Sequence, residues 1–435
     1  MTDAETTSHL PAAGRLRREL GLHEALAIGV GGTVGGGIFV LVGAAAGLAG
    51  PAALLAFLLA FAVAMVIALP YAELACRLPL AGGGYAFARE VLGPRWGALM
   101  GWGYGGAYLF LSGFVTLGFG GYLAAVTGIP RPGGALALVA ACTVLNLLGV
   151  KLSGRTQGLV VLVALGGLMA LVLWGLPELR LDRLGPLAPH GAHGVLQAAL
   201  VAFLSLGGFD MVAAAGEEVR QPERNLPRAI VLTLLGVVGL YLLVALVALG
   251  SLPPARLGAS AAPLAEAAGV FGGQAARRLI VGCALLTTAA TANAVLVVTS
   301  RVVFAMARDR LLPGPLAAVG RRGGAPWAAV LACGAGLALV AGAGSVRFAT
   351  SAGGFLYVLH FVPPLLALVV LRRRDGGRRP AFATPAPRLL LPLALAASAA
   401  LAAAAGRTGL LGGGAWLLAG AVLLPGRRRL RAPAR

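Results

Sequence analysis

Charged side chains are scarce in this sequence. Only 11% of its 435 residues are Asp, Glu, Lys or Arg, whereas 59% are hydrophobic, and an ordinary soluble domain carries about 25% charged residues. Lysine is nearly absent, since Lys151 is the only one and arginine supplies the other basic residues. The four cysteines do not follow metal-site spacings, so we expect buried free thiols. So low a fraction of charged residues excludes a soluble globular protein.

Long apolar runs take the place of the missing charges. The net charge of +20 does not indicate a nucleic-acid partner, because the basic residues form short clusters between these runs. The expected surroundings are membrane lipid, and a spanning helix needs about 20 apolar residues. Twelve spans are predicted at 24–48, 51–70, 97–125, 134–150, 157–177, 195–219, 228–250, 277–306, 325–342, 349–371, 387–405 and 409–425.

The positions of the basic residues test this number of spans and their orientation. With a cytoplasmic N-terminus, 27 of the 35 Lys and Arg residues fall on the cytoplasmic side and 8 on the outer side. Cytoplasmic loops of membrane proteins carry such an excess, and a miscounted span would destroy the alternation. We therefore expect a multi-pass protein of the inner (cytoplasmic) membrane with both termini cytoplasmic. The sequence carries no signal for an oligomeric state.

The first predicted span contains a cluster of glycines. Residues 29–37 read GVGGTVGGG, with six glycines in nine positions, and each interior glycine costs a helix about 1 kcal/mol relative to alanine. One alternative is close helix packing through small residues. The other is a helix that unwinds in the membrane, where free N–H groups at the start of the second half-helix face an anion. A nucleotide-binding loop is not indicated, because no strand precedes the segment.

A second interruption lies five spans later. Residues 203–210 read FLSLGGFD, with Gly207 and Gly208 inside an apolar run. Matched breaks in two halves are typical of inverted-repeat transporters, and they favour the broken-helix interpretation of both glycine segments. The predicted fold is an all-α integral membrane protein of twelve helices, a 5+5 inverted repeat with discontinuous helices 1 and 6 and two further C-terminal helices. Its expected parts are a cytoplasmic segment 1–23, repeats 24–177 and 195–371, a basic cytoplasmic linker 372–386, helices 11 and 12 in 387–425, and a basic cytoplasmic tail 426–435.

Three ordered motifs resemble a known family. GVGGTVGGGIF in span one, PYAELACRLPLAGGGYAFARE after span two and GGFDMVAAAGEEVRQPERNLPRAI through span six are similar to the amino acid–polyamine–organocation (APC) superfamily. The third motif is most similar to its cationic amino-acid transporters and to the bacterial basic amino-acid and polyamine branch. The resemblance runs from about Leu20 to Pro313 and fades in the later spans.

The resemblance implies a substrate site made mainly of backbone. It places the substrate carboxylate at the amides of Gly35, Gly36 and Gly37. It places the substrate ammonium near carbonyls on both broken helices. The implied substrate-binding residues are Thr33, Val34, Gly35, Gly36, Gly37, Phe203, Leu204, Ser205, Leu206 and Gly207.

Two departures from the family affect these expectations. Leu204 stands where many members have a large aromatic gate, so Phe203 or Phe209 supplies the gate or the gate is looser. Some proton-coupled members carry a lysine in span five, where this chain has Ala164 and no span contains lysine. Lysine-based proton coupling is therefore not expected, and sodium, another proton carrier or exchange remains as the driving mode. We expect no cofactor and no bound metal beyond a coupling ion.

A few polar side chains within the spans are coupling candidates, because charges in the bilayer are costly. Asp210 directly follows the second break, and the alternative is an acid paired with an inner-loop arginine. His360 in span ten is a second candidate because histidine as a residue type suits proton transfer, and the alternative is a hydrogen-bonded structural histidine. Span eight contains the hydroxyls of Thr287, Thr288 and Thr291. These hydroxyls could coordinate a sodium ion, and the alternative is that they form hydrogen bonds between helices. Glu73 is expected to form a structural pair with nearby Arg77.

These observations predict a secondary active transporter of amino acids. No ATP-binding motif is present, so an ion gradient or a counter-substrate would drive it. The alternative is a channel or a non-transporting sensor with the same fold. A membrane-embedded enzyme is not indicated, because the spans lack clustered catalytic side chains.

Overall fold

The computed structural model describes residues 18, 20–80, 83–148, 154–216, 218–320, 326–374 and 380–424. Its elements in this part of the chain are helices, apart from one isolated parallel bridge between Leu20 and Val219. A helix satisfies its backbone hydrogen bonds internally, which a segment surrounded by lipid requires. The expected C-terminal tail 426–435, most of the N-terminal segment and the middle of the linker 372–386 lie outside the described residues.

Seventeen α-helices and three short 3₁₀ helices make up the described part of the chain. The α-helices are α1 Leu22–Thr33, α2 Gly37–Ala49, α3 Ala53–Arg77, α4 Gly83–Leu92, α5 Pro94–Thr127, α6 Arg131–Leu147, α7 Gly154–Gly175, α8 Gly191–Ser205, α9 Met211–Ala214, α10 Pro222–Ser251, α11 Pro254–Ala259, α12 Pro263–Arg308, α13 Trp327–Gly342, α14 Val346–Leu359, α15 Val362–Arg374, α16 Pro387–Ala404 and α17 Gly406–Leu423. The 3₁₀ helices are η1 Gly50–Ala52, η2 Leu181–Leu184 and η3 Gly314–Ala317.

The helices agree with the predicted spans in position. Each predicted span overlaps one helix or a pair of helices. In the described chain, seven helical segments are long and apolar enough to cross a membrane, and α6, α8 and α13 are shorter apolar helices. The seven segments are Gly37–Arg77, Pro94–Thr127, Thr156–Gly175, Pro222–Ser251, Pro263–Arg308, Val346–Arg374 and Pro387–Ala404. The all-helical membrane fold is therefore confirmed, and the count of twelve spans stays a prediction.

The structure differs from the expected element boundaries in three places. The helix expected from residue 277 begins at Pro263 and kinks at Gly273, whose φ of 59° only glycine adopts readily. Helix α4, which no span predicted, lies between α3 and α5. Span ten is divided into α14 and α15 just before Pro363 and Pro364, because proline cannot donate the backbone hydrogen bond that would continue the helix.

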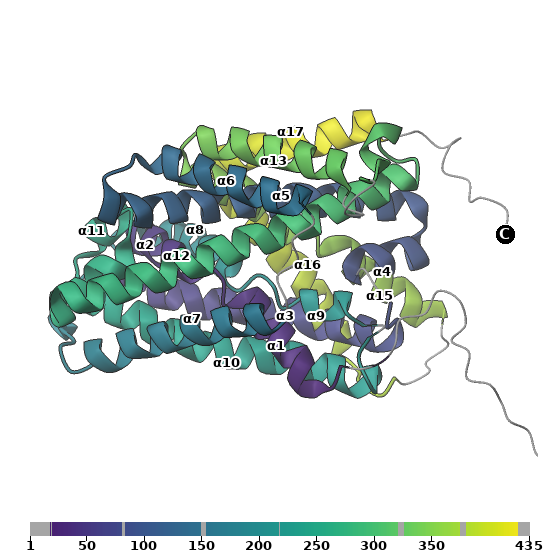
Figure 1. The fold of residues 1–435 in the computed structure, drawn as a ribbon. Coiled ribbons are helices and arrows are strands. Elements are labelled where there is room, and N and C mark those ends of the chain that lie inside the picture. The colour runs from purple at the N-terminus through teal and green to yellow at the C-terminus, as the bar shows by residue number, and fades with distance from the viewer. Residues whose placement is uncertain are drawn as a thin grey trace, which may run out of the picture.

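The two broken helices lie among the long helices. In the view of Figure 1, α5, α6, α13 and α17 lie along one side, α1, α7 and α10 along the other, and α12 crosses between them. Helix α2 packs against α8, α8 packs against α3, and α12 packs against α5 and α7. The unwound segments are therefore enclosed by protein, the condition under which irregular backbone is tolerated at membrane depth.

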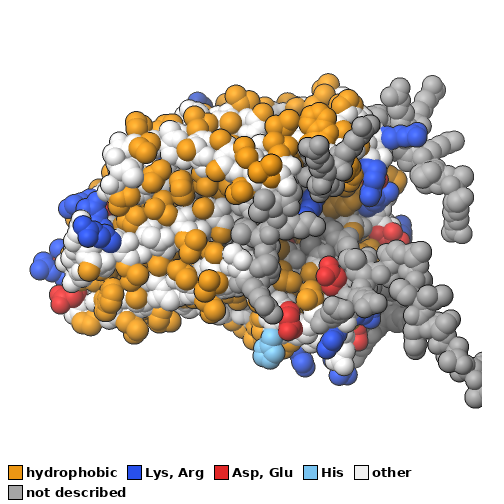
Figure 2. All heavy atoms as spheres, viewed as in Figure 1, with side chains coloured by type: hydrophobic (Ala, Val, Ile, Leu, Met, Phe, Trp, Pro, Cys, Tyr) orange, Lys and Arg blue, Asp and Glu red, His pale blue; other side chains and the backbone are white. Residues whose placement is uncertain are grey.

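The outer surface fits a lipid environment. Figure 2 shows hydrophobic side chains over the middle of this face and most charged side chains toward its two ends. Large apolar side chains face outward, among them Leu339, Leu411 and Val422. A soluble monomer rarely exposes so continuous an apolar surface.

The structure confirms two smaller predictions about buried side chains. The four cysteines Cys76, Cys142, Cys283 and Cys333 are buried free thiols. Glu73 is fully buried and accepts from Arg77 Nε at 2.9 Å, from the Arg372 guanidinium and from the backbone amide of Thr384. The carboxylate thus ties α3 to α15 and to the segment before α16.

Candidate substrate-binding and coupling site

The first glycine cluster ends one helix and begins the next. Helix α1 ends at Thr33, α2 begins at Gly37, and Val34, Gly35 and Gly36 lie between them outside both helices. The first amides of α2 have no acceptor within the helix, so they are available to an anion at the positive end of its dipole. The predicted unwinding is therefore seen at the expected glycines.

Other glycines of the same cluster serve close packing, so both interpretations hold at different positions. A Cβ on Gly29 would lie 2.3 Å from the hydroxyl oxygen of Thr233 on α10, and one on Gly31 would lie 3.2 Å from Val161 of α7. These two glycines let α1 approach its neighbours, as small residues do in membrane helix pairs.

The second break separates α8 from α9. Helix α8 ends at Ser205 and α9 begins at Met211. Gly208 between them has φ 117°, which favours glycine. The Gly207 amide donates to the Leu204 carbonyl at 3.1 Å, so a turn rather than a helix continues the chain.

The two breaks touch each other. A Cβ on Gly208 would lie 2.3 Å from the carbonyl carbon and oxygen of Gly32 and 2.7 Å from the amide nitrogen of Thr33. A Cβ on Gly37 would lie 3.3 Å from Cα of Ser205. Backbone donors and acceptors from segments about 170 residues apart in the sequence therefore line one small region.

Helix α12 supports the first break with its threonines. The Gly36 amide donates to Thr291 Oγ1 at 3.1 Å, and Cγ2 of Thr288 would lie 2.6 Å from a Cβ on Gly36. Thr287, Thr288 and Thr291 each donate their hydroxyl to the carbonyl four residues earlier. Helix–helix hydrogen bonding therefore accounts for Thr291 without an ion.

Tyr241 of α10 is a contact that the sequence did not indicate. Its hydroxyl donates to the Thr33 carbonyl at 2.9 Å, and the same carbonyl accepts from the Gly35 amide at 2.8 Å. Nothing in the apolar run of span seven distinguishes this tyrosine, because its partner is a backbone group more than 200 residues away.

Asp210 lies in a cage of tyrosine and histidine. Its carboxylate is 2% exposed and accepts from the hydroxyls of Tyr357 at 2.9 Å and Tyr108 at 3.3 Å, and from the Gly208 amide at 3.3 Å. Nε2 of His360 lies 3.7 Å from Oδ2 of Asp210. Among the described residues, His360 is thus the basic side chain beside this carboxylate. Inner-loop Arg321 and Arg322 lie outside the described residues, so the alternative of an arginine partner is not tested.

The two ionisable coupling candidates therefore meet at the second break. His360 caps the C-terminus of α14 at the division of span ten, which brings its ring beside Asp210. Nε2 of His360 is buried and makes no hydrogen bond to the described residues. Since buried polar atoms are normally paired, this unpaired nitrogen stands out beside the Asp210 carboxylate.

Aromatic rings close the region around these groups. Phe203 and Phe209 are fully buried, and both contact the ring of Phe361, at centroid distances of 6.2 and 5.4 Å. Phe203 also lies 5.8 Å from the ring of Tyr357. Leu204 is buried beside them without an aromatic ring of its own. Both phenylalanines thus lie beside the position of Leu204, and a gate formed by either of them stays a prediction.

Comparison with known proteins agrees with this architecture. A family model described as amino acid permease matches residues 20–408. An uncharacterized transporter of Mycobacterium bovis is 35% identical over 87% of this chain and 84% of its own length. The branched-chain amino acid permease BcaP of Bacillus subtilis is 28% identical over 94% of this chain and 92% of its own length. The vacuolar cationic amino acid transporter 4 of Arabidopsis thaliana is 31% identical over 80% of this chain and 64% of its own length.

Proposed function

Because the chain belongs to the amino acid permease family, and is thus a membrane transporter and not an enzyme, we propose that it carries amino acids across the cytoplasmic membrane by alternating access. The proposed topology has twelve spans, both termini in the cytoplasm and two inverted five-helix repeats at 24–177 and 195–371. A break in the first span of each repeat supports this organisation.

The contact of the two breaks at Gly32 and Gly208 carries the proposal. It brings backbone N–H donors and carbonyl acceptors together at one point. The amide of Gly37, at the start of α2, binds the substrate carboxylate, and Phe203 and Ser205 form the wall beside it. The amides of Gly35 and Gly36, which the family resemblance also assigns to the carboxylate, already donate to the Thr33 carbonyl and to Thr291 Oγ1, so they stabilise the unwound segment. Amide donors suit an anion, and carbonyls at broken helix ends suit a cation.

Fewer carbonyls are available to the substrate ammonium than the family resemblance implies. The Thr33 carbonyl already accepts from both Tyr241 and the Gly35 amide, and a carbonyl oxygen has two lone pairs. We therefore assign the ammonium to the carbonyls of Val34, Leu206 and Gly207, with Leu204 contributing its remaining lone pair. Thr33 instead holds the break in position.

Asp210 and His360 couple transport to protons in this proposal. The carboxylate is buried without an arginine among the described residues, so its charge depends on its hydrogen-bond partners and on the histidine. The titratable groups that face it are Tyr108 from α5 and Tyr357 and His360 from α14 and its cap, and Tyr104 contacts both the Tyr108 and the His360 rings. A change of charge on this cluster would alter how the second break is held against the end of α14.

Counterflow in proteoliposomes tests the proposal. Purified full-length protein is reconstituted and assayed with the twenty amino acids and common polyamines, with and without sodium and with and without a pH gradient. We expect counterflow of amino acids and net uptake driven by a pH gradient alone. If uptake requires sodium, we would assign the coupling site to Thr287, Thr288 and Thr291 instead. Flux without counterflow would contradict a carrier mechanism.

A further inference from the structure

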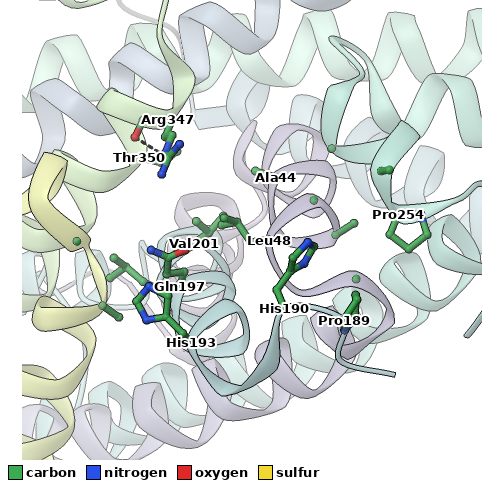
Figure 3. A pocket seen from close by; sticks show the side chains of 18 of the residues that line it. Ala44, Leu48, Pro189, His190, His193, Gln197, Val201, Pro254, Arg347 and Thr350 are labelled. Atoms are coloured by element: carbon green, nitrogen blue, oxygen red, sulfur yellow. Dashed lines mark hydrogen bonds between the residues drawn. The ribbon is translucent and has the colours of Figure 1, made fainter. Parts of the chain in front are cut away.

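A large cavity of the described chain lies at one end of the bundle, away from the aromatic cage. Its volume is about 960 Å³, and its walls come from the end of α2, the segment before α8, the start of α11 and the beginnings of α8, α14 and α17. Figure 3 shows His190, His193, Gln197 and Arg347 around this space. In the proposed topology this end faces outward, and we call the cavity the outer vestibule.

The side chains of the outer vestibule carry charge of one sign. Its titratable lining residues are Arg183, His190, His193, Arg347 and Arg407, and no described lining residue is Asp or Glu. The Arg183 guanidinium is held by the carbonyls of Gly250 and Ser251. Arg347 and Arg407 are exposed. The charge of the vestibule is therefore positive and is not balanced by acids in its own wall.

Helix orientation adds to this positive potential. Helices α8, α14 and α17 all begin in the vestibule wall, and none has an acidic residue in its first turn. Their first turns instead carry His193, Arg347 and Arg407. Because a helix N-terminus bears a partial positive charge, basic side chains there are unfavourable unless an anion is nearby. Two independent features of the vestibule thus favour the same kind of ligand group.

The floor of the outer vestibule is apolar and leads toward the two breaks. Its apolar lining residues include Leu48 of α2 and Leu200 and Val201 of α8. Val201 precedes Ser205 by one helical turn, about 6 Å along the axis, and Ser205 packs against Gly37 of the first break. The residues of α8 between the vestibule wall and the first break, Ala202, Phe203 and Leu204, are buried and uncharged.

We propose that the outer vestibule first binds the carboxylate of an amino acid and discriminates against substrates with a net positive charge. The transported class is then α-amino acids with uncharged side chains, rather than lysine, arginine or polyamines. This inference rests on the proposed function. It opposes the cationic substrates that the resemblance to cationic transporters suggests, because a cation meets an unpaired positive field before it reaches the breaks.

The test compares substrates of different charge in proteoliposomes containing the full-length protein. Leucine uptake is measured in competition with lysine, with N-acetyl-leucine, which keeps the carboxylate but lacks the ammonium, and with leucinamide, which lacks the carboxylate. We expect lysine and leucinamide to compete at least about tenfold more weakly than unlabelled leucine, and N-acetyl-leucine to inhibit. Inhibition by lysine equal to that by leucine would overturn the inference.

Charge variants locate the effect. The double variant Arg347→Gln, Arg407→Gln is expected to raise the KM for leucine about fivefold with kcat unchanged, and to remove inhibition by N-acetyl-leucine. The reversal Arg347→Glu, Arg407→Glu is expected to improve lysine competition. Arg278→Gln is the matched control, because Arg278 is exposed near the same end and does not line the cavity. Equal effects of all three changes would overturn the role of the vestibule.

Direct binding separates this inference from the proposed function. The thermal stability of purified protein is measured with N-acetyl-leucine and with leucinamide, and the double glutamine variant is compared with wild type. If no amino acid is transported but N-acetyl-leucine alone raises the Tm of wild type, the proposed function fails and the vestibule site stands. If transport occurs and neither compound distinguishes wild type from the double variant, the vestibule inference fails alone.

Discussion

The two helix breaks meet at one point but are built differently. The first, Val34–Gly36, contains no ionisable side chain, and its neighbours are hydroxyls from α10 and α12. The second, Leu206–Asp210, ends in a buried carboxylate surrounded by Tyr108, Tyr357 and His360.

This difference separates two tasks. A backbone break recognises groups common to every amino acid, because amides and carbonyls are the same whatever the neighbouring side chains. A break that contains a buried carboxylate responds to pH, because protonation changes the charge of that carboxylate. The following changes test this division, in order of decreasing expected effect.

Gly208→Ala tests the point where the breaks touch. The added Cβ would lie 2.3 Å from backbone atoms of Gly32, and a φ of 117° is costly for alanine, so we expect a loss of several kcal/mol and little or no uptake. Uptake and thermal stability in detergent are measured together. Gly93→Ala is the matched control, since Gly93 has φ 99° but open space around it. Equal losses in both variants would assign the effect to backbone strain alone.

Gly36→Leu tests the carboxylate site. The new side chain would enter the space of Thr288 and Val115, with Cγ2 of Thr288 2.6 Å from the Cβ position, and it would cover the adjacent Gly37 amide that faces the substrate. We expect amino-acid uptake to fall by about a hundredfold or more, the equivalent of roughly 3 kcal/mol. Gly105→Leu, at a buried glycine of α5 with no atom within 4 Å of its Cβ position, is the control. Normal uptake by correctly inserted Gly36→Leu protein would refute the amide site.

Asp210→Asn tests the coupling role of the second break. Asparagine keeps the shape and removes the charge, so substrate counterflow is expected to persist while uptake driven by a pH gradient falls about tenfold. Wild-type uptake should rise as the outer pH falls, and the variant profile should be flat. Asp309→Asn, where the acid pairs with Arg89 at a partly exposed position, controls for the loss of an acid. An unchanged pH profile in Asp210→Asn would exclude the coupling role.

Thr291→Val tests the support that α12 gives to the first break. The change removes the acceptor of the Gly36 amide and little volume, and one such hydrogen bond contributes about 0.5–1.5 kcal/mol. The KM is expected to rise about threefold to tenfold at unchanged kcat, in the absence of sodium. Thr143→Val on α6, which removes a similar intrahelical hydrogen bond, is the comparison. A loss of sodium-dependent uptake instead would indicate an ion site.

Much of the fold was accessible from the sequence because it depends on local composition. Apolar runs of membrane-spanning length predicted the helices, and the clustering of Gly35–Gly37 and Gly207–Gly208 predicted both interruptions. The start of α12 at Pro263 was missed because residues 263–276 contain polar and small residues, which resemble a loop when tertiary packing is unknown. Helix α4 was missed because it is amphipathic and too short to span a membrane.

The partners of the candidate site residues were less accessible. Asp210 and His360 were selected separately as costly groups in apolar runs, but no spacing rule connects residues 150 positions apart. The sequence left Asp210 open between a coupling role and pairing with an inner-loop arginine, and it gave no sign of the aromatic hydroxyls that donate to the carboxylate or of the imidazole beside it. Tyr241 carried no signal at all, because it binds a backbone carbonyl.

The sequence by itself determined that the chain is a helical membrane protein interrupted at two glycine segments, since hydropathy and glycine content act locally on each segment. Only the tertiary structure decided that Gly32 and Gly208 touch, that Asp210 shares its cage with His360, and that three helices direct their N-termini and basic side chains into one vestibule. These arrangements depend on the packing of segments distant in sequence, where approach distance and orientation, rather than composition, determine which groups interact.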